Sequence, residues 1–233
     1  MRRFLGFILV VSFILSFFSS PADAWFDETH VAIAKAAGYS KWFNAAGPDI
    51  VKEKMFNREG HNHFVNNPRG TTITPEIVLA QAGKYNKIDS FGHLYGAIIS
   101  SVRDYVKMKS RGKYGEYHLA FCAHYVGDLS QPLHNIEYNS FNQSRHKDID
   151  GIIDDGILDN LDKIKVYPIR IDSEETLAKE IARIANQAMT LGYKLEDENR
   201  LLTKEESYQQ LSHSVSLFKA ILEYVSGGTK PEK

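Results

Sequence analysis

The residues with the clearest chemical potential lie between His124 and Asp150. Five side chains in this stretch offer nitrogen or oxygen donors suited to a metal ion: His124, Asp128, His134, His146 and Asp150. Residues four apart on a helix share one face, so the stretch holds two imidazole–carboxylate pairs with His134 between them. One such pair is common on a solvated helix face, but this combination favours a metal centre. Zinc accepts such a mixture of ligands.

Helices must position these donors. The spacing of apolar residues predicts a helix from near Tyr114 that presents His124 and Asp128 on one side. Pro132 ends this helix and turns the chain, so that His134 returns toward the same point. A further helix, predicted over residues 141–163, carries His146 and Asp150.

The remaining elements are predicted to be helical as well. In the first half of the chain they are a helix capped by Asp27 and ended by Gly38, a short helix over 49–57, a helix opened by Thr74 and Pro75, and a long helix from Leu94 to near Gly112. In the second half, a capping box of Asp172 and Glu175 opens one helix. Thr203 and Glu206 open the last helix, and Gly227 ends it. Residues 58–72 are predicted to form a loop and residues 165–171 a connection. The predicted fold class is all-α, a single-domain helical bundle with a trinuclear metal site between helices.

The composition describes one folded domain and gives no sign of a polyanionic partner. Of the 233 residues, 43% are hydrophobic and 24% are charged, which is enough to bury a substantial core. The formal net charge is −1, so nothing favours binding to nucleic acid by charge alone. Cys122 is the only cysteine, so the domain must be stable without an internal disulfide.

The N-terminus has the pattern of a secretory signal peptide. Arg2 and Arg3 precede an apolar run over residues 4–18, and Ala22-Asp23-Ala24 is an A-x-A cleavage site. The alternative is an uncleaved membrane anchor, for which this apolar run is short. We therefore expect a signal peptide over residues 1–24, a catalytic domain over 25–233 that begins at Trp25, and a secreted or periplasmic location.

The motifs resemble those of the zinc-dependent bacterial phospholipases C and their relatives, the fungal single-strand-specific nucleases. The resemblance is carried by HYVGD at 124–128, QPLH at 131–134, and then His146 and Asp150. It implies that the amino nitrogen and carbonyl oxygen of an N-terminal Trp bind zinc, which Trp25 would do after cleavage. It also implies remote ligands that His30, Asp49 and His63 match in order and context.

This resemblance implies three zinc ions, with nine ligand residues over 25–150. The first ion would be held by Asp49, His63, His124 and Asp128, the second by His134, His146 and Asp150, and the third by Trp25 and His30 with Asp128 as a bridge. Closely spaced divalent ions generate hydroxide near neutral pH and bind phosphate oxygens. Asp49 is the expected general base.

Several of these residues have simpler interpretations. His61 lies two residues from His63 in the same predicted loop, and the following Phe and the Asn67-Pro68 context favour His63. Asp49 could be a helix cap and Trp25 a buried anchor. The other donors, namely Asp148, Asp154, Asp155, His93, His118 and His213, are interpreted as surface or core residues.

The substrate class is less fixed than the metal ligands. The spacing between His134 and His146 and the single cysteine favour a phospholipase over the nucleases, which contain disulfides. In contrast, Asp150 favours the nucleases, because they have an aspartate at this ligand position. In the phospholipases that bind choline, two aromatic residues line the headgroup pocket. Ile50 and Gly60 occupy the corresponding positions here, and Glu28 lies where the carboxylate of that pocket is expected.

The expected function is that of a monomeric phospholipase C that acts on phospholipid at a membrane surface. It would release diacylglycerol and a phosphorylated headgroup. The alternatives are a phosphodiesterase that acts on single-stranded nucleic acid, and a zinc-binding or lipid-binding module without turnover. No protein partner is implied.

Overall fold

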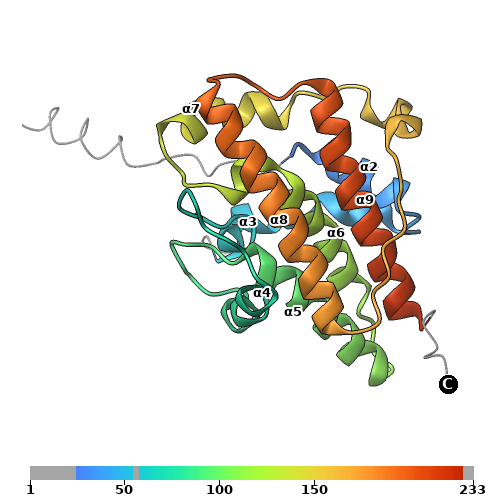
Figure 1. Ribbon diagram of the computed structural model, residues 1–233. Coiled ribbons are helices and arrows are strands. Elements are labelled where there is room, and N and C mark those ends of the chain that lie inside the picture. The colour runs from blue at the N-terminus through green and yellow to red at the C-terminus, as the bar shows by residue number, and fades with distance from the viewer. Residues whose placement is uncertain (1–24, 55–57, 228–233) are drawn as a thin grey trace, which may run out of the picture.

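The computed structural model describes residues 25–54 and 58–227. Within these ranges the α-helices are α2 (Asp27–Ala36), α3 (Gly47–Lys54), α4 (Pro75–Gln81), α5 (Leu94–Ser110), α6 (Glu116–Ser130), α7 (Ser140–Asp150), α8 (Glu174–Asp197) and α9 (Lys204–Ser226). Short 3-10 helices connect them, including η2 (Trp42–Ala46), η3 (Glu59–Asn62), η5 (Pro132–Asn135), η6 (Ile157–Asp159) and η7 (Leu161–Lys163). The predicted all-α, single-domain fold is confirmed (Figure 1).

The predicted signal peptide over 1–24 lies outside the described residues. None of the helices that the structure describes is long and apolar enough to cross a membrane.

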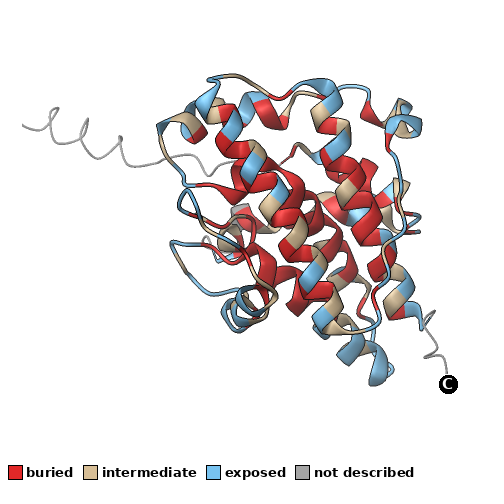
Figure 2. Cartoon of the chain, viewed as in Figure 1, coloured by how far each residue is buried: buried red, intermediate tan, exposed pale blue. Residues whose placement is uncertain are grey.

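Helix α6 is the centre of the bundle. Helices α2, α5, α8 and α9 pack against it (Figure 1). Its second half, from Cys122 to Ser130, is buried on every side, as expected of a helix in the middle of a core. Figure 2 shows the same concentration of buried residues in the interior of the bundle. His124 and Asp128 therefore lie deep in the protein, away from bulk water.

Two helix starts predicted from capping residues are confirmed. Thr74 Oγ1 accepts a hydrogen bond from the amide of Ile77 and precedes Pro75 at the first position of α4. Thr203 and Glu206 form the reciprocal capping box of α9, and Gly227 ends that helix with a φ of 86° in the left-handed region. Helix α8 does have a capping box, but it is made by Ser173 and Thr176 instead of Asp172 and Glu175.

The predicted cap of α2 is wrong for a reason that involves a distant loop. Asp27 is the first residue of the helix, and Phe26 stands at the N-cap without a side-chain hydrogen bond. The amide and hydroxyl of Thr29 donate instead to Oδ1 of Asp154, at 3.0 and 3.1 Å. A carboxylate from the chain beyond α7 thus satisfies the first turn of α2.

The predicted helix over 141–163 is also too long, because α7 ends at Asp150. Gly151 follows at the C-cap, where an added Cβ would lie 2.8 Å from the Phe26 ring. Gly156 then takes a φ of 80°, which turns the chain into η6 and η7. Asp154 lies between these two glycines, where it reaches Thr29 of α2. The short second helix is α3, which begins at Gly47, and its predicted end at residue 57 lies outside the described residues.

Candidate metal centre

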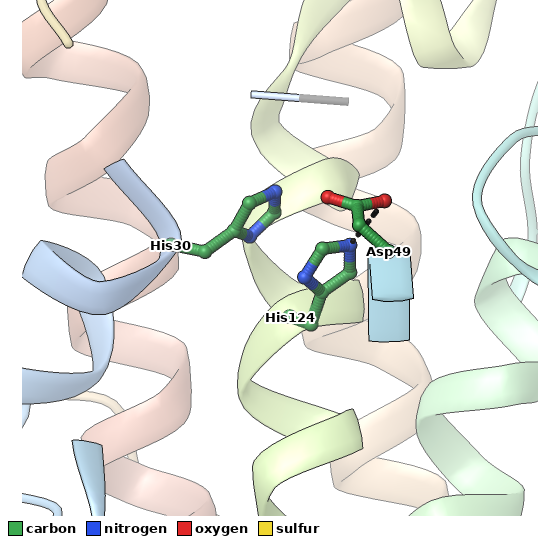
Figure 3. A group of neighbouring side chains, drawn as sticks. All are labelled: His30, Asp49 and His124. Atoms are coloured by element: carbon green, nitrogen blue, oxygen red, sulfur yellow. Dashed lines mark ion pairs between the residues drawn. The ribbon is translucent and has the colours of Figure 1, made fainter. Parts of the chain in front are cut away.

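The predicted ligands come together from six parts of the fold. His30 lies on α2, Asp49 on α3, and His124 and Asp128 on α6. His63 follows η3, His134 lies in η5, and His146 and Asp150 lie on α7. Figure 3 shows His30, Asp49 and His124 converging from three different helices. All eight of these side chains except Asp49 are buried.

The donors form three groups, each with one ligand atom per residue within 4.8 Å of the others. The groups are His63, His124 and Asp128; His134, His146 and Asp150; and His30, Asp49 and His124. The second group is the predicted set for the second ion. The first group contains the predicted ligands of the first ion except Asp49. The Oδ1 atom of Asp49 lies nearby, 3.6 Å from His124 Nε2 and 3.8 Å from His63 Nδ1. The residues present therefore suit metal ions in number and type.

Asp128 is the point where the groups meet. Its Oδ2 lies 3.0 Å from His63 Nδ1 and 3.4 Å from His124 Nε2. Its Oδ1 lies 3.4 Å from His30 Nε2 and 3.8 Å from His134 Nδ1. Within the described part of the chain, neither oxygen accepts a hydrogen bond. Burying a carboxylate in this way is unfavourable unless a cation compensates it, which favours Asp128 as a metal ligand; its bridging role stays a prediction.

In the second group, two imidazole nitrogens face each other, and a cation between them would remove the repulsion of their lone pairs. His134 Nε2 and His146 Nε2 lie 3.1 Å apart. The Nδ1 atom of His134 donates to the carbonyl oxygen of His63, and Nδ1 of His146 donates to Asn142 Oδ1 at 2.6 Å. Since each neutral imidazole carries one proton, both Nε2 atoms present lone pairs to each other. Asp150 Oδ2 lies 3.4 Å from His146 Nε2 and adds a negative charge to the same space.

The local structure fixes these orientations. Asn142 donates its own amide to the carbonyls of Leu133 and Glu137, so only its Oδ1 can face His146. On α6, His124 Nδ1 donates to the carbonyl of Ala45 at 2.8 Å, which turns Nε2 toward the centre. Histidines that bind metals typically donate their second ring nitrogen in this way.

His30 is held against the centre by its neighbours. Its ring stacks on that of His124, with centroids 3.6 Å apart and planes inclined by 14°. Neither ring nitrogen of His30 makes a hydrogen bond to the residues that the structure describes. Its grouping with Asp49 and His124 differs from the predicted third site, in which its partners are Trp25 and Asp128. The 3.4 Å contact with Asp128 is compatible with both arrangements.

Trp25 is fully buried and precedes Phe26, the N-cap residue of α2. Its amino group becomes a possible ligand only if the chain is cleaved after Ala24, which lies outside the described residues. A tryptophan that only anchors the chain in the core would have the same buried indole. Its role as a ligand therefore stays a prediction.

Burial keeps the histidines neutral, the state that binds metals. It lowers the pKa of His30, His63 and His124, and it lowers the pKa of His134 to about 3. Burial and the nearby charge of Asp49 raise the pKa of Asp128. Without a cation, the centre thus disfavours charge on every one of these groups.

Asp49 is electrostatically different from Asp128. Its side chain is 24% exposed, whereas that of Asp128 is fully buried. Burial acts to raise the pKa of Asp49, but His124, His63 and Lys52 outweigh it, and the pKa is lowered. Asp49 is therefore an ionised carboxylate at the edge of the centre, within reach of solvent.

Two charged residues next to the ligands were missed by sequence reasoning. Lys52 is buried, and its Nζ lies 3.5 Å from Asp49 Oδ1. Glu59 is buried too, and its Oε1 lies 3.5 Å from His63 Nε2. Their spacing to Asp49 and His63, three and four residues on a short helical turn, was the available signal. It is weak because it needs the ligands to be known first.

The residues set aside from the sequence do lie elsewhere. His93 bonds to Asn62 Oδ1, His213 to the hydroxyl of Tyr167, and Asp154 to Thr29. Asp148 and Asp155 are exposed, and His118 is half-buried beside Tyr117. His63 and not His61 belongs to the groups of possible ligands.

A groove of about 690 Å³ opens beside the elements that carry His30, Asp49 and His124. Phe43, Ile50, Tyr114 and Tyr117 line it and are exposed large hydrophobic residues. Of the three residues expected near a headgroup, Glu28 and Ile50 line this groove, whereas Gly60 does not. Its volume is typical of a site for a small molecule or a part of a larger one.

No family model matches this chain, and no curated protein matches its sequence.

Proposed function

We propose that this protein is a divalent-metal phosphodiester hydrolase of the zinc-dependent phospholipase C type. The observation that carries the proposal is the convergence of buried His and Asp donors around Asp128, which has no hydrogen bond from the described residues on either oxygen. His63, His124 and Asp128 would hold one ion, with Asp49 beside them. His134, His146 and Asp150 would hold another, and His30 would contribute to a third.

The reaction assigned to this site is attack of water on a phosphodiester. Closely spaced divalent cations, when bound, supply a hydroxide nucleophile near neutral pH and neutralise charge on the phosphate. Asp49 would accept the proton of the attacking water, because it is ionised and its side chain is partly exposed. Asp128 is fully buried and would serve only as a ligand.

The groove supports phospholipid as the substrate. Apart from Asp27 and Glu28, the described residues that line it are uncharged, and most of them are apolar or aromatic. Sites for single-stranded nucleic acid combine stacking aromatic rings with a positively charged track for the backbone. Acidic side chains disfavour such a backbone and suit a cationic headgroup. Glu28 would contact that headgroup, and the apolar lining would contact the glycerol and acyl portions.

The test is to assay the mature protein, loaded with zinc, against three substrates in parallel. They are vesicles of phosphatidylcholine and phosphatidylethanolamine, vesicles of phosphatidylglycerol, and single-stranded DNA. We expect release of diacylglycerol, with the zwitterionic vesicles preferred. Hydrolysis of DNA alone would replace the phospholipase with the nuclease alternative. No hydrolysis of any substrate at full metal occupancy would overturn the enzyme assignment in favour of a binding module.

A further inference from the structure

Glu59 is a buried carboxylate directly behind the ligand His63. It begins η3, is 3% exposed, and lies on the side of His63 opposite to Asp128. Its Oε1 is 3.5 Å from His63 Nε2 and accepts a hydrogen bond from the hydroxyl of Tyr125. Its Oε2 accepts a hydrogen bond from Asn62 Nδ2 at 2.8 Å. The carboxylate is thus fixed by donors from two elements.

The proton of His63 has two possible positions, and they have opposite consequences. His63 Nδ1 faces the centre, 3.2 Å from His124 Nε2 and 3.0 Å from Asp128 Oδ2. His124 already donates from Nδ1 to Ala45, so its Nε2 carries a lone pair. A proton on His63 Nδ1 would be donated to His124 or Asp128, and this nitrogen could then bind no metal. A proton on Nε2 leaves the Nδ1 lone pair directed at the centre.

We infer that Glu59 is a positioning residue that keeps the His63 proton on Nε2 and thereby directs Nδ1 toward the metal. A carboxylate behind a metal-binding histidine fixes the tautomer and raises the basicity of the ligand. His124, His134 and His146 use neutral oxygens for the same purpose. His134 Nδ1 also lies 3.8 Å from a carboxylate, that of Asp128, but it donates to the carbonyl oxygen of His63, whereas Glu59 is the acceptor beside Nε2 of His63.

Tyr125 connects Glu59 to the central helix. It follows His124 on α6, is fully buried, and packs edge-on against the His63 ring with centroids 5.7 Å apart. The Tyr125 hydroxyl donates a hydrogen bond to Oε1 of Glu59, and a carboxylate oxygen has a second lone pair that can accept a proton from His63 Nε2. The 3.5 Å separation from His63 exceeds an ordinary hydrogen bond, and we expect it to shorten when His63 binds a cation.

The inference rests on the proposed metal centre but not on hydrolysis of a phosphodiester. It is tested by competition titration of zinc against a chromophoric chelator, with the wild-type protein, Glu59→Gln, Tyr125→Phe and Glu116→Gln. Glu116 is a matched control, since it is partly buried on α6 and accepts hydrogen bonds from Tyr39 and Tyr105. We expect Glu59→Gln to weaken the binding of one ion about 10- to 100-fold, Tyr125→Phe to weaken it less, and Glu116→Gln to leave it unchanged.

A second measurement needs no variant and applies even if Glu59→Gln fails to fold. The tautomer of His63 is read from the imidazole ¹⁵N shifts of the zinc-loaded wild-type protein. We expect a proton on Nε2 and the metal on Nδ1. A proton on Nδ1, or an unchanged zinc affinity in a folded Glu59→Gln protein, would overturn the role of Glu59. Weakened zinc binding in a protein that hydrolyses none of the substrates would leave it intact.

Discussion

The backbone of Gly127 lies directly against the imidazole of His30. A Cβ added at Gly127 would come within 2.6 Å of His30 Nδ1 and 2.9 Å of its Cε1. Only a glycine on α6 allows α2 to bring His30 this close, so that its ring stacks on His124. The glycine of the HYVGD motif thus has a physical role: it makes room for a ligand on another helix.

Gly127→Ala is therefore expected to displace His30. Alanine favours a helix by up to about 1 kcal/mol over glycine, but overpacking a buried contact costs roughly 1 to 3 kcal/mol. We expect the variant to bind one metal ion fewer and to be less stable than the wild type. Gly83→Ala is the control, because an added Cβ there meets nothing within 4 Å. Metal analysis and urea unfolding provide the test, and an unchanged metal content in Gly127→Ala would contradict it.

Asp128→Asn should change stability in opposite directions with and without zinc. In metal-free protein it removes a buried charge that accepts no hydrogen bond from the described residues, so the free energy of unfolding should rise by roughly 1 to 3 kcal/mol. In zinc-loaded protein it removes a bridging ligand, so metal is lost and stability falls. Thermal unfolding in chelator and in zinc measures both effects. A change of the same sign in both conditions would speak against Asp128 as a metal ligand.

Asp49→Asn separates the proposed base from the metal ligands. Its carboxylate is at the exposed edge of the centre, and loss of a general base typically reduces the rate about 10²- to 10⁴-fold. We expect this loss in kcat, with most of the bound zinc retained. Asp155→Asn, an exposed aspartate, is the control. Unchanged turnover would remove Asp49 as the base, and a loss of zinc in proportion to the loss of activity would make it a ligand only.

A pH effect outside the centre follows from His213. Burial lowers its pKa to about 4, and the charge of Arg183 adds to this effect. The unfolded chain binds a proton at this position below about 6.5, whereas the folded protein does so only near 4. The contribution of neutral His213 to the free energy of unfolding is therefore fully present above pH 6.5, and it is lost as the pH falls toward 4. In urea unfolding of metal-free protein, the wild type should lose more stability between pH 7 and 5 than His213→Gln, and equal losses would refute this assignment.

The sequence predicted the parts of the fold that depend on local chemistry. Thr203 with Glu206 and Thr74 with Pro75 mark helix starts because their partners are three residues away or adjacent. The donors of α6, η5 and α7 were found because Pro132 and the helical spacing fix their relation. The remote donors Asp49 and His63 were found through a resemblance, and the fold brings both to His124.

The missed features depend on contacts between distant segments. Asp154 caps the first turn of α2 across 125 residues, so the start of α2 could not be derived locally. Lys52 and Glu59 appear as ordinary charged residues in the sequence, and they become notable only because both are buried beside ligands. Burial of a charge depends on the whole packed structure and not on the spacing of residues.

The most direct test of the proposed metal centre is the metal content of the mature protein. The protein, beginning at Trp25, would be purified without added metal, dialysed, and analysed by plasma mass spectrometry alongside Asp128→Asn. We predict up to three divalent ions per chain, one for each group of ligands, with fewer in the variant. Wild-type protein that is folded, holds less than one ion per chain and takes up none from added zinc would contradict this prediction.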